Sequence, residues 1–205
     1  MYLYQYIRKN KPIEILECGT GVSTLIMTTA LKELESEGYE VGKITSMDSH
    51  KEYLEMSRDL LPENLEKYVD FHLSDVMEDF FSIYRGVRYS DIPNREYDFA
   101  FIGGPDYKAP SDGMLTFDFD FLYVLLRSKN PLAGMVDKRV STCYVLQQLL
   151  GIDRVKYEPV SHLGFIKPST KSNLLTIDTV TPSLTSSDSY RVIIPTKLIY
   201  SRKFP

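Results

Sequence analysis

The sequence predicts an α/β fold in which a doubly wound, mostly parallel sheet is covered by helices on both faces. Short β-type apolar runs alternate with helical patterns over residues 1–150. A glycine turn, Gly19 to Gly21, joins the first of these runs to the first helical pattern. Parallel neighbours need long crossovers, and helices supply them, so this alternation favours a parallel sheet.

The first half of the chain contains three strand-and-helix units. The expected strands are residues 13–18, 41–47 and 68–73. Apolar residues recur at helical spacing from Ser23 onward, and a second helix over 52–61 is expected to stop before Pro62, because proline disfavours helical geometry in the preceding residue. Residues 76–84 also fit a helix.

The later part of the chain continues the alternation and then changes texture. We expect strands over 97–102 and 132–137, and helices over 117–127 and 142–150, the last closed by Gly151. Residues 154–160, 163–167 and 174–180 are β-like, and the Ser/Thr-rich stretch 179–189 is typical of an exposed loop. The sequence therefore predicts one domain over 1–205, with a core of about 12–167 and a C-terminal extension of about 168–205 that makes this end β-rich.

The composition is that of an ordinary globular protein. The 205 residues include 24 Lys+Arg and 28 Asp+Glu, a net charge of −4, and 43% are hydrophobic, which excludes collagen-like, coiled-coil and wholly disordered chains. The mild acidity argues against nucleic-acid binding, although a local basic patch stays open. Cys18 and Cys143 lie far apart without metal-ligand spacing, so neither a disulfide framework nor a zinc ribbon is expected.

The same survey favours a cytoplasmic protein. The first residues lack the apolar core of a secretory signal, and no stretch approaches the roughly 18 apolar residues that span a bilayer. We expect no membrane partner, and the sequence leaves the oligomeric state open, a homo-oligomer included.

The most informative segment is the first strand and its turn. The strand ends in Glu17, Gly19 and Gly21 follow, and a hydroxyl residue opens the helix. Such a turn lets a ligand approach the backbone at the carboxyl edge of the sheet. On its own, the pattern is weak evidence and more often marks a plain tight turn.

Two further carboxylates follow the next strands. Asp48 ends the second strand, where a carboxylate can accept hydrogen bonds from both ribose hydroxyls, and Asp75 follows the third, where it could accept from an adenine amine. Each is individually compatible with a helix N-cap. Because Glu17, Asp48 and Asp75 fall at the same edge of the expected sheet, together they favour a nucleotide-like ligand.

These segments carry a family resemblance. Glu-Cys-Gly-Thr-Gly-Val-Ser-Thr-Leu from Glu17, the strand end at Asp48, Ser-Asp-Val from Ser74 and Tyr-Asp-Phe-Ala-Phe-Ile-Gly-Gly-Pro from Tyr97 resemble the class I S-adenosylmethionine-dependent methyltransferases, near the macrocin-type O-methyltransferase branch. The resemblance covers roughly residues 12–167. It implies a Rossmann-like methyltransferase domain that uses S-adenosyl-L-methionine to methylate a small-molecule or sugar-like acceptor. The identity of the acceptor and the choice between O- and N-methylation stay open.

The resemblance also implies roles for individual residues in cofactor binding. Glu17 would hold the methionine amino group directly or through water, and Asp48 would bind the ribose hydroxyls. The remaining residues would line the methionine path or frame the adenine: Gly19, Thr20 and Gly21 for the path, Asp75 and Val76 for the adenine.

The chain departs from the metal-dependent members of this neighbourhood. Those members carry Asp where Gly103 stands, often His where Asp106 stands, and Asn where Lys138 follows Asp137. A hard cation needs several oxygen ligands, so we expect no metal site and doubt any dependence on a divalent metal.

Methyl transfer to a hydroxyl still needs a proton acceptor. By position, the candidates are Asp106, Asp137 and His50. Lys138 and Arg139, with Lys108, are available to bind an anionic acceptor or to lower the pKa of its hydroxyl.

Two other classes of protein remain as alternatives. A catalytically inactive SAM-fold binding or interaction module is compatible with Gly103. An NAD(P)-dependent oxidoreductase shares the fold logic, but its fingerprint usually carries a third glycine where this chain has Thr24. The P-loop, zinc-protease and α/β-hydrolase motifs are absent from the sequence.

Overall fold

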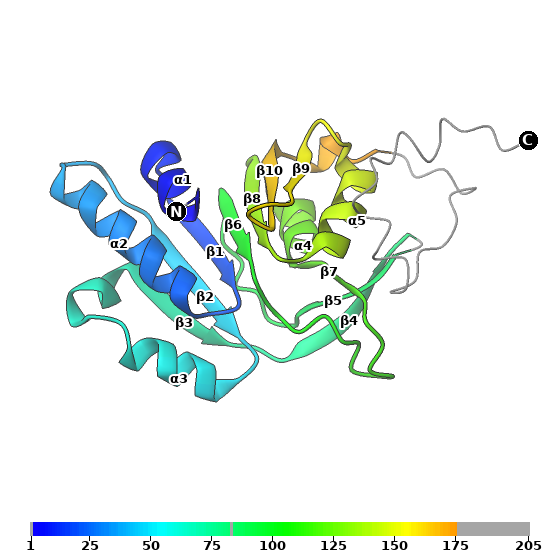
Figure 1. The fold of residues 1–205 in the computed structure, drawn as a ribbon, viewed down its shortest axis with the longest axis horizontal. Helices are drawn as coiled ribbons and strands as arrows, with labels where there is room; N and C mark the ends of the chain where they lie inside the picture. Colours follow the sequence, from blue (N-terminus) through cyan, green and yellow to red (C-terminus); the bar gives the residue numbers. More distant parts are fainter. Residues whose placement is uncertain (1, 83, 176–205) are drawn as a thin grey trace, which may run out of the picture.

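The structure is a computed structural model that describes residues 2–82 and 84–175. Within these residues, a seven-stranded sheet has the order β3-β2-β1-β6-β8-β10-β9, and a three-stranded sheet has the order β4-β5-β7 (Figure 1). The strands are β1 Glu14–Cys18, β2 Lys43–Asp48, β3 Val69–Leu73, β4 Val76–Phe81, β5 Tyr84–Tyr89, β6 Phe99–Ile102, β7 Phe117–Asp118, β8 Leu132–Asp137, β9 Val155–Glu158 and β10 Leu163–Ser169. The helices are α1 Tyr2–Asn10, α2 Val22–Ser36, α3 Lys51–Asp59, α4 Asp120–Arg127 and α5 Val140–Leu150, with short 3-10 turns η1 Glu63–Tyr68 and η2 Lys171–Asn173.

The large sheet confirms the expected fold class. Strands β3, β2, β1, β6 and β8 are parallel neighbours, while β10 runs antiparallel to both β8 and β9. From β1 the chain builds outward to β2 and β3 and then returns to place β6 on the other side of β1. In open α/β sheets, such a reversal of strand order leaves a crevice at the carboxyl ends of the two central strands.

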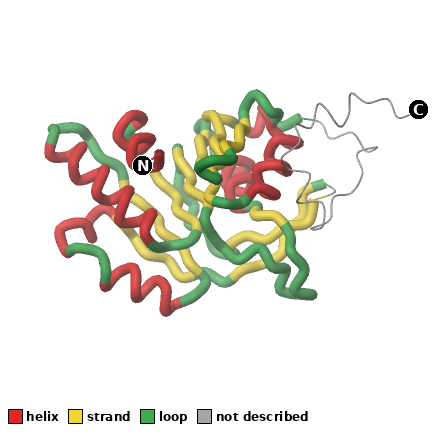
Figure 2. The backbone as a smooth tube through the Cα atoms, in the orientation of Figure 1, coloured by secondary structure: helices red, strands yellow, loops and turns green. Residues whose placement is uncertain are grey.

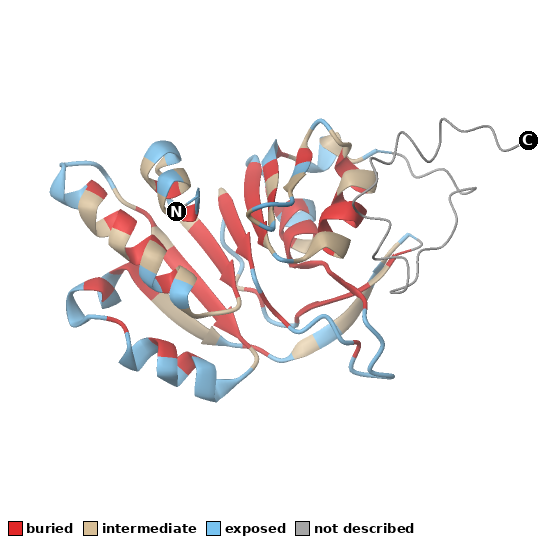
Figure 3. Cartoon of the chain, in the orientation of Figure 1, coloured by how far each residue is buried: buried red, intermediate tan, exposed pale blue. Residues whose placement is uncertain are grey.

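Alternating side chains of the strands feed two cores, one on each face of the large sheet. Ile15 of β1 packs with α1 and α2, whereas the adjacent Leu16 packs with α4, α5 and the smaller sheet. The period of two along a strand produces this division. In Figure 2 helices lie to either side of the strands, and Figure 3 shows the central strands almost wholly buried.

The strand expectations agree with the structure to within a few residues, and the two β-like runs 154–160 and 163–167 form β9 and β10. Helix α4 begins at Asp120 because residues 117 and 118 form β7, and α5 begins two residues before the expected start. Helix α1, with Leu3 and Ile7 buried one turn apart, was not expected. Most of 174–180, and all of 179–189, lie outside the described residues. None of the described helices is long and apolar enough to cross a membrane.

The helix expected over 76–84 is wrong. Residues 76–81 and 84–89 form an antiparallel hairpin, with Val76 opposite Tyr89 and Phe81 opposite Tyr84. Ser82 has a positive φ of 55°, as a tight hairpin turn requires. The apolar spacing of this segment fits either structure, and its aromatic content and the matching run over 84–89 favour strands.

Candidate functional site

The glycine turn at the carboxyl end of β1 is built by contact between two backbones. Gly19 has a φ of 88°, and a Cβ there would lie 2.6 Å from the nitrogen of Gly104. A Cβ on Gly104 would lie 2.7 Å from the Cα of Gly19. The N–H groups of Gly103 and Gly104 both donate to the carbonyl of Cys18, at 2.7 and 2.6 Å. Gly19 is therefore required first for packing of the two loops against each other, before any question of ligand approach.

Gly103 and Gly104 differ in the space around them. A Cβ on Gly103 would meet only ordinary contacts, at 3.4 Å from Phe101 and 3.5 Å from the carbonyl of Cys18. Gly104, by contrast, is closed against Gly19. The backbone at Gly103 thus has room for a side chain. The carboxylate that metal-dependent methyltransferases carry at this position is absent only because the residue is glycine.

Glu17 lies beneath the turn and is fully buried. Its Oε2 accepts hydrogen bonds from the hydroxyls of Thr24, at 2.6 Å, and Ser46, at 2.5 Å. Burial raises the pKa of Glu17 to about 7, although the neighbouring hydroxyls favour the ionised form. The carboxylate therefore braces the turn against α2 and β2, and direct contact with a methionine amino group stays a prediction.

Asp48, at the end of β2, holds two turns together and is 7% exposed. Its Oδ1 accepts from the N–H of His50 at 2.9 Å, and its Oδ2 accepts from the N–H of Thr20 at 3.3 Å. The N-cap residue of α3 is His50, so Asp48 is not a helix N-cap. The carboxylate keeps unused acceptor capacity at the edge of the cavity described next.

Two cavities meet at the glycine turn and share three wall residues, Gly19, Thr20 and Gly103. The Asp48 cavity has a volume of about 380 Å³. Its other walls are Asp48, Ser49, His50, Tyr53, Tyr89, Gly104, Pro105, Asp106 and Arg139. The Asp137 cavity has a volume of about 560 Å³. Its other walls are Tyr2, Leu3, Val22, Ser23, Ile26, Phe101, Asp137, Ser161 and Leu163.

The predicted cofactor residues are brought together only in part. Gly19, Thr20 and Asp48 line one cavity, and Gly21 begins α2 beside it as the N-cap. Asp75 is exposed where β3 gives way to the hairpin, and its carbonyl accepts from the N–H of Ser90. Neither Asp75 nor Val76 lines either cavity. Their contact with an adenine stays a prediction.

The predicted catalytic residues divide between the two cavities. Asp106 lies in the Asp48 cavity with its side chain 61% exposed, 3.8 Å from the ammonium of Lys108. Asp137 lies in the other cavity. Lys138 has a positive φ of 54°, and its N–H donates to the carbonyl of His162, which fixes the turn that follows β8. Arg139, the next residue, lines the Asp48 cavity together with Asp106.

Arg139 belongs to a buried cluster that sequence reasoning missed. Its Nη2 donates to the carbonyl of Gly103 at 2.7 Å, and its Nη1 lies 3.4 Å from Oδ2 of the fully buried Asp118. Asp120, equally buried, accepts from the N–H of Tyr89 at 2.9 Å. An Asp-x-Asp pair ahead of a helix was the only signal in the sequence, and it does not reveal burial.

Burial raises the pKa of both aspartates. Burial raises the pKa of Asp118 to about 6, and Arg139 opposes this rise. Burial and the neighbouring Asp118 raise the pKa of Asp120 well above its ordinary value. The carboxylate of Asp118 faces the guanidinium of Arg139, which in turn holds the loop at Gly103 in place.

The expectation of no metal site stays a prediction. Among residues 2–82 and 84–175, no three His, Cys, Asp or Glu side chains form a group that could hold a metal ion. Asp106 and Asp137 line different cavities.

Neither a scan against protein-family models nor a search of curated proteins finds a match to this chain.

Proposed function

We propose that this chain is an S-adenosylmethionine-dependent methyltransferase that acts on a hydroxyl group of a small molecule. The observation that carries the proposal is the position of Asp48. This buried carboxylate ends β2, next to the strand at which the strand order reverses, and lines a cavity together with Gly19 and Thr20 of the glycine turn. A carboxylate there suits the two hydroxyls of a ribose.

The residues around the glycine turn fit such a cofactor. The two glycines of the turn expose backbone, and α2 begins directly after it, with Val22 and Ser23 of its first turn lining the Asp137 cavity. A helix start favours an anionic group such as a carboxylate. The two cavities share Gly19 and Thr20. A cofactor with its ribose at Asp48 would lie against this shared turn.

The structure gives less support to the oxidoreductase alternative. Dinucleotide-binding sheets of the usual order 3-2-1-4-5-6 are mostly parallel, whereas an antiparallel strand, β10, lies between β8 and β9 here. The position of the third fingerprint glycine is taken by Thr24, whose hydroxyl accepts from the N–H of Gly21 and donates to Glu17. That threonine ties the turn to the buried carboxylate.

When bound, S-adenosylmethionine would supply a methyl group on a positively charged sulfur. The protein has to align the acceptor oxygen with that carbon and to take up the hydroxyl proton as the new bond forms, and no covalent intermediate is needed. Besides Asp48, the carboxylates that line the two cavities are Asp106 in one and Asp137 in the other. Either can accept the proton, and the loop at Gly103, held by Arg139, fixes the wall between them.

Calorimetric titration tests the proposal. We expect S-adenosylmethionine and S-adenosylhomocysteine to bind in the micromolar range, about −7 to −8 kcal/mol, and NAD to give no signal. Binding of both ligands without methyl transfer to any acceptor would favour the inactive-module alternative. Folded protein that gives no heat with either ligand at millimolar concentration would contradict the proposal.

Asp48→Ala should weaken S-adenosylhomocysteine binding by about 1.5–3 kcal/mol, or about 10- to 150-fold, because charge-assisted hydrogen bonds to the ribose are lost. Since Asp48 also holds the N–H groups of Thr20 and His50, stability should fall by about 1 kcal/mol. Calorimetry and urea unfolding measure the two effects. Asp59→Ala, at the exposed end of α3, is the matched control. Lost stability with unchanged affinity would leave Asp48 a structural role only.

Methyl transfer should survive treatment with EDTA. Asp106 and Asp137 line different cavities, and Gly103 supplies no carboxylate, so a magnesium ion would lack the several protein oxygens that fix its geometry. The measurement compares initial rates before chelation, after it, and after magnesium is added back. Activity that vanishes with EDTA and returns with magnesium would show that another group acts as a ligand.

A further inference from the structure

The wall shared by the two cavities contains a peptide group that is held at both ends. The N–H of Gly104 donates to the carbonyl of Cys18 at 2.6 Å. The carbonyl of Gly103, in the same peptide group, accepts from Nη2 of Arg139 at 2.7 Å. Gly103 lines both cavities, and Gly104 lines the Asp48 cavity. A rotation of this peptide would therefore change which of its polar atoms face a ligand.

Packing alone does not fix the orientation of this peptide. A peptide between two glycines has no Cβ on either side to hinder its rotation. A Cβ at Gly103 would meet only ordinary contacts, at 3.4 Å and 3.5 Å, so the surroundings leave space there. Gly19 packs against Gly104, and this contact limits where the peptide lies rather than how its carbonyl points. The hydrogen bonds at the two ends have to supply the orientation.

The guanidinium of Arg139 is itself held on two further sides. Its side chain is only 10% exposed, and its Nη1 lies 3.4 Å from Oδ2 of Asp118. The ring of Tyr107 lies 5.3 Å from its guanidinium carbon. Arg139 therefore has one hydrogen bond to the wall and a buried counter-charge behind it.

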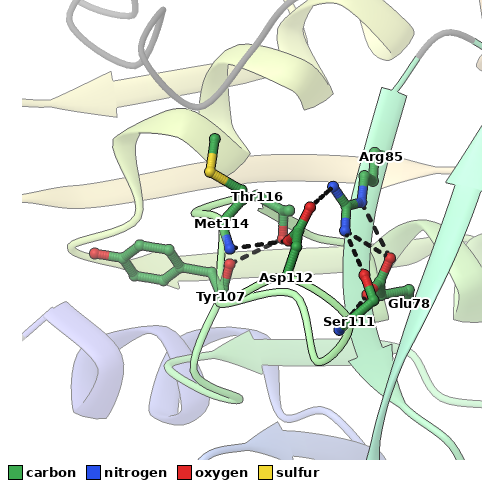
Figure 4. A network of polar contacts seen from close by, with 7 residues as sticks. All are labelled: Glu78, Arg85, Tyr107, Ser111, Asp112, Met114 and Thr116. Carbon is green, nitrogen blue, oxygen red and sulfur yellow. Dashed lines mark hydrogen bonds and ion pairs between the residues drawn. The ribbon is translucent and has the colours of Figure 1, made fainter.

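The loop that carries Tyr107 is anchored by contacts of its own. Thr116 donates to the carbonyl of Tyr107 through both its N–H, at 2.8 Å, and its hydroxyl, at 2.9 Å. Figure 4 shows how Arg85 ties the same loop to the β4-β5 hairpin: it donates to Asp112 at 2.8 Å and to Glu78 of β4 at 2.8 Å. The ring beside the guanidinium is thus in place without any ligand.

Asp118 is held as firmly as the guanidinium that it faces. Its Oδ1 accepts from the N–H of Asp120 at 3.2 Å, and its own N–H donates to the hydroxyl of Thr142 in α5 at 3.2 Å. Its buried Oδ2 has no hydrogen-bond partner among the described residues and lies in the ion pair with Arg139. Asp118 lines neither cavity, so any effect that it has on a ligand has to pass through Arg139.

We propose that Asp118 is a positioning residue: through Arg139 it locks the peptide between Gly103 and Gly104, and so the wall against which the cofactor lies. The consequence for the cofactor rests on the proposed function, whereas the lock itself does not. The lock needs the fork of a guanidinium, because Nη1 faces the carboxylate while Nη2 reaches the carbonyl. A lysine ammonium is a single point charge and does not span both groups.

Hydrogen exchange of the Gly104 amide, followed by NMR in the chain without ligand, tests the lock. Calorimetry with S-adenosylhomocysteine tests its consequence. In Asp118→Asn we expect exchange about tenfold faster and binding about tenfold weaker, as for the loss of one charged hydrogen bond. The matched control is Asp79→Asn, which removes the carboxylate partner of Arg88, an arginine whose side chain is also 10% exposed. Neither Asp79 nor Arg88 lines the two cavities, so this variant should leave exchange and affinity unchanged.

A second variant, Arg139→Lys, keeps a cation opposite Asp118 and decides the question if Asp118→Asn fails to fold. It should show the same two effects, because the fork is lost while the charge is kept. The double variant should bind S-adenosylhomocysteine no more weakly than either single variant, since both act through one hydrogen bond. A general loosening of the chain would instead make the two effects add.

The outcomes separate this inference from the proposed function. A wild-type chain that binds no S-adenosylhomocysteine would refute the proposed function, and the exchange of Gly104 would still decide the lock. Wild-type exchange in Asp118→Asn or in Arg139→Lys would overturn the lock, even in a chain that binds the cofactor. Faster exchange with wild-type affinity, or additive effects in the double variant, would overturn the positioning role of Asp118.

Discussion

An Asp106→Asn variant is expected to transfer methyl groups about two to four orders of magnitude more slowly than the wild-type chain, the usual range for loss of a general base. Asp106 shares its cavity with Asp48 and Arg139. With the ribose held at Asp48, Asp106 is the candidate proton acceptor of the same cavity, whereas Asp137 lines the other one. Asparagine keeps the shape of the side chain but cannot take up the proton.

Asp137→Asn is the matched control and should stay within a few-fold of the wild-type rate. Asp106 is exposed and its only ion pair, among the described residues, is the long one with Lys108, so the variant should fold with nearly unchanged stability. The measurement is single-turnover transfer of labelled methyl to a panel of hydroxylated carboxylates and phosphates. If Asp137→Asn shows the large loss instead, the acceptor hydroxyl lies in the Asp137 cavity.

Glu17→Gln should flatten the dependence of stability on pH. The folded chain holds the Glu17 proton up to about pH 7, whereas the ordinary value is 4.5, so the folded state binds more protons than the unfolded state in this interval. The free energy of unfolding of the wild type should therefore fall as pH rises from about 4.5 to 7, by up to about 1.4 kcal/mol per pH unit and about 3 kcal/mol in all for this group. Glutamine has no proton to lose and still accepts from Thr24 and Ser46.

Urea unfolding between pH 5 and 8 measures this slope. Asp118 and Asp120 have raised pKa values too, so the variant should lose one group's share of the slope and keep theirs. The control is Glu35→Gln, because Lys67 and Tyr68 lower the pKa of Glu35 and its contribution disappears only below about pH 4.5. A Glu17→Gln slope identical to that of the wild type would mean that Glu17 is ionised in the folded chain at pH 5.

The parts of the fold that could be predicted are those with local causes. The apolar run that ends at Glu17, the glycine turn and the carboxylate at Asp48 mark the carboxyl edge of the sheet, and the structure places them there. The hairpin over 76–89 was wrongly predicted as a helix because its stability comes from pairing with a partner strand and with β7, which sequence spacing does not show.

The candidate site divides in the same way. Asp75 was expected at the edge because it follows the third strand, but the hairpin that begins at Val76 leaves it exposed. The cluster of Asp118, Asp120 and Arg139 joins segments distant in sequence, and only tertiary packing makes it buried. Predicting it would have required knowing which helix covers which face.

The two glycines after β6 differ in whether they can be replaced by a residue with a side chain. Any side chain at Gly104 would push its loop away from Gly19, and a side chain at Gly19 would do the same to Gly104. A substitution at either of these two positions is therefore restricted by the other. Gly103 carries no such constraint, since a Cβ there meets only ordinary contacts. A single Gly103→Asp replacement would place a carboxylate on the wall shared by the two cavities without moving the backbone. A carboxylate can therefore be added to this wall by one tolerated mutation, without a change of architecture.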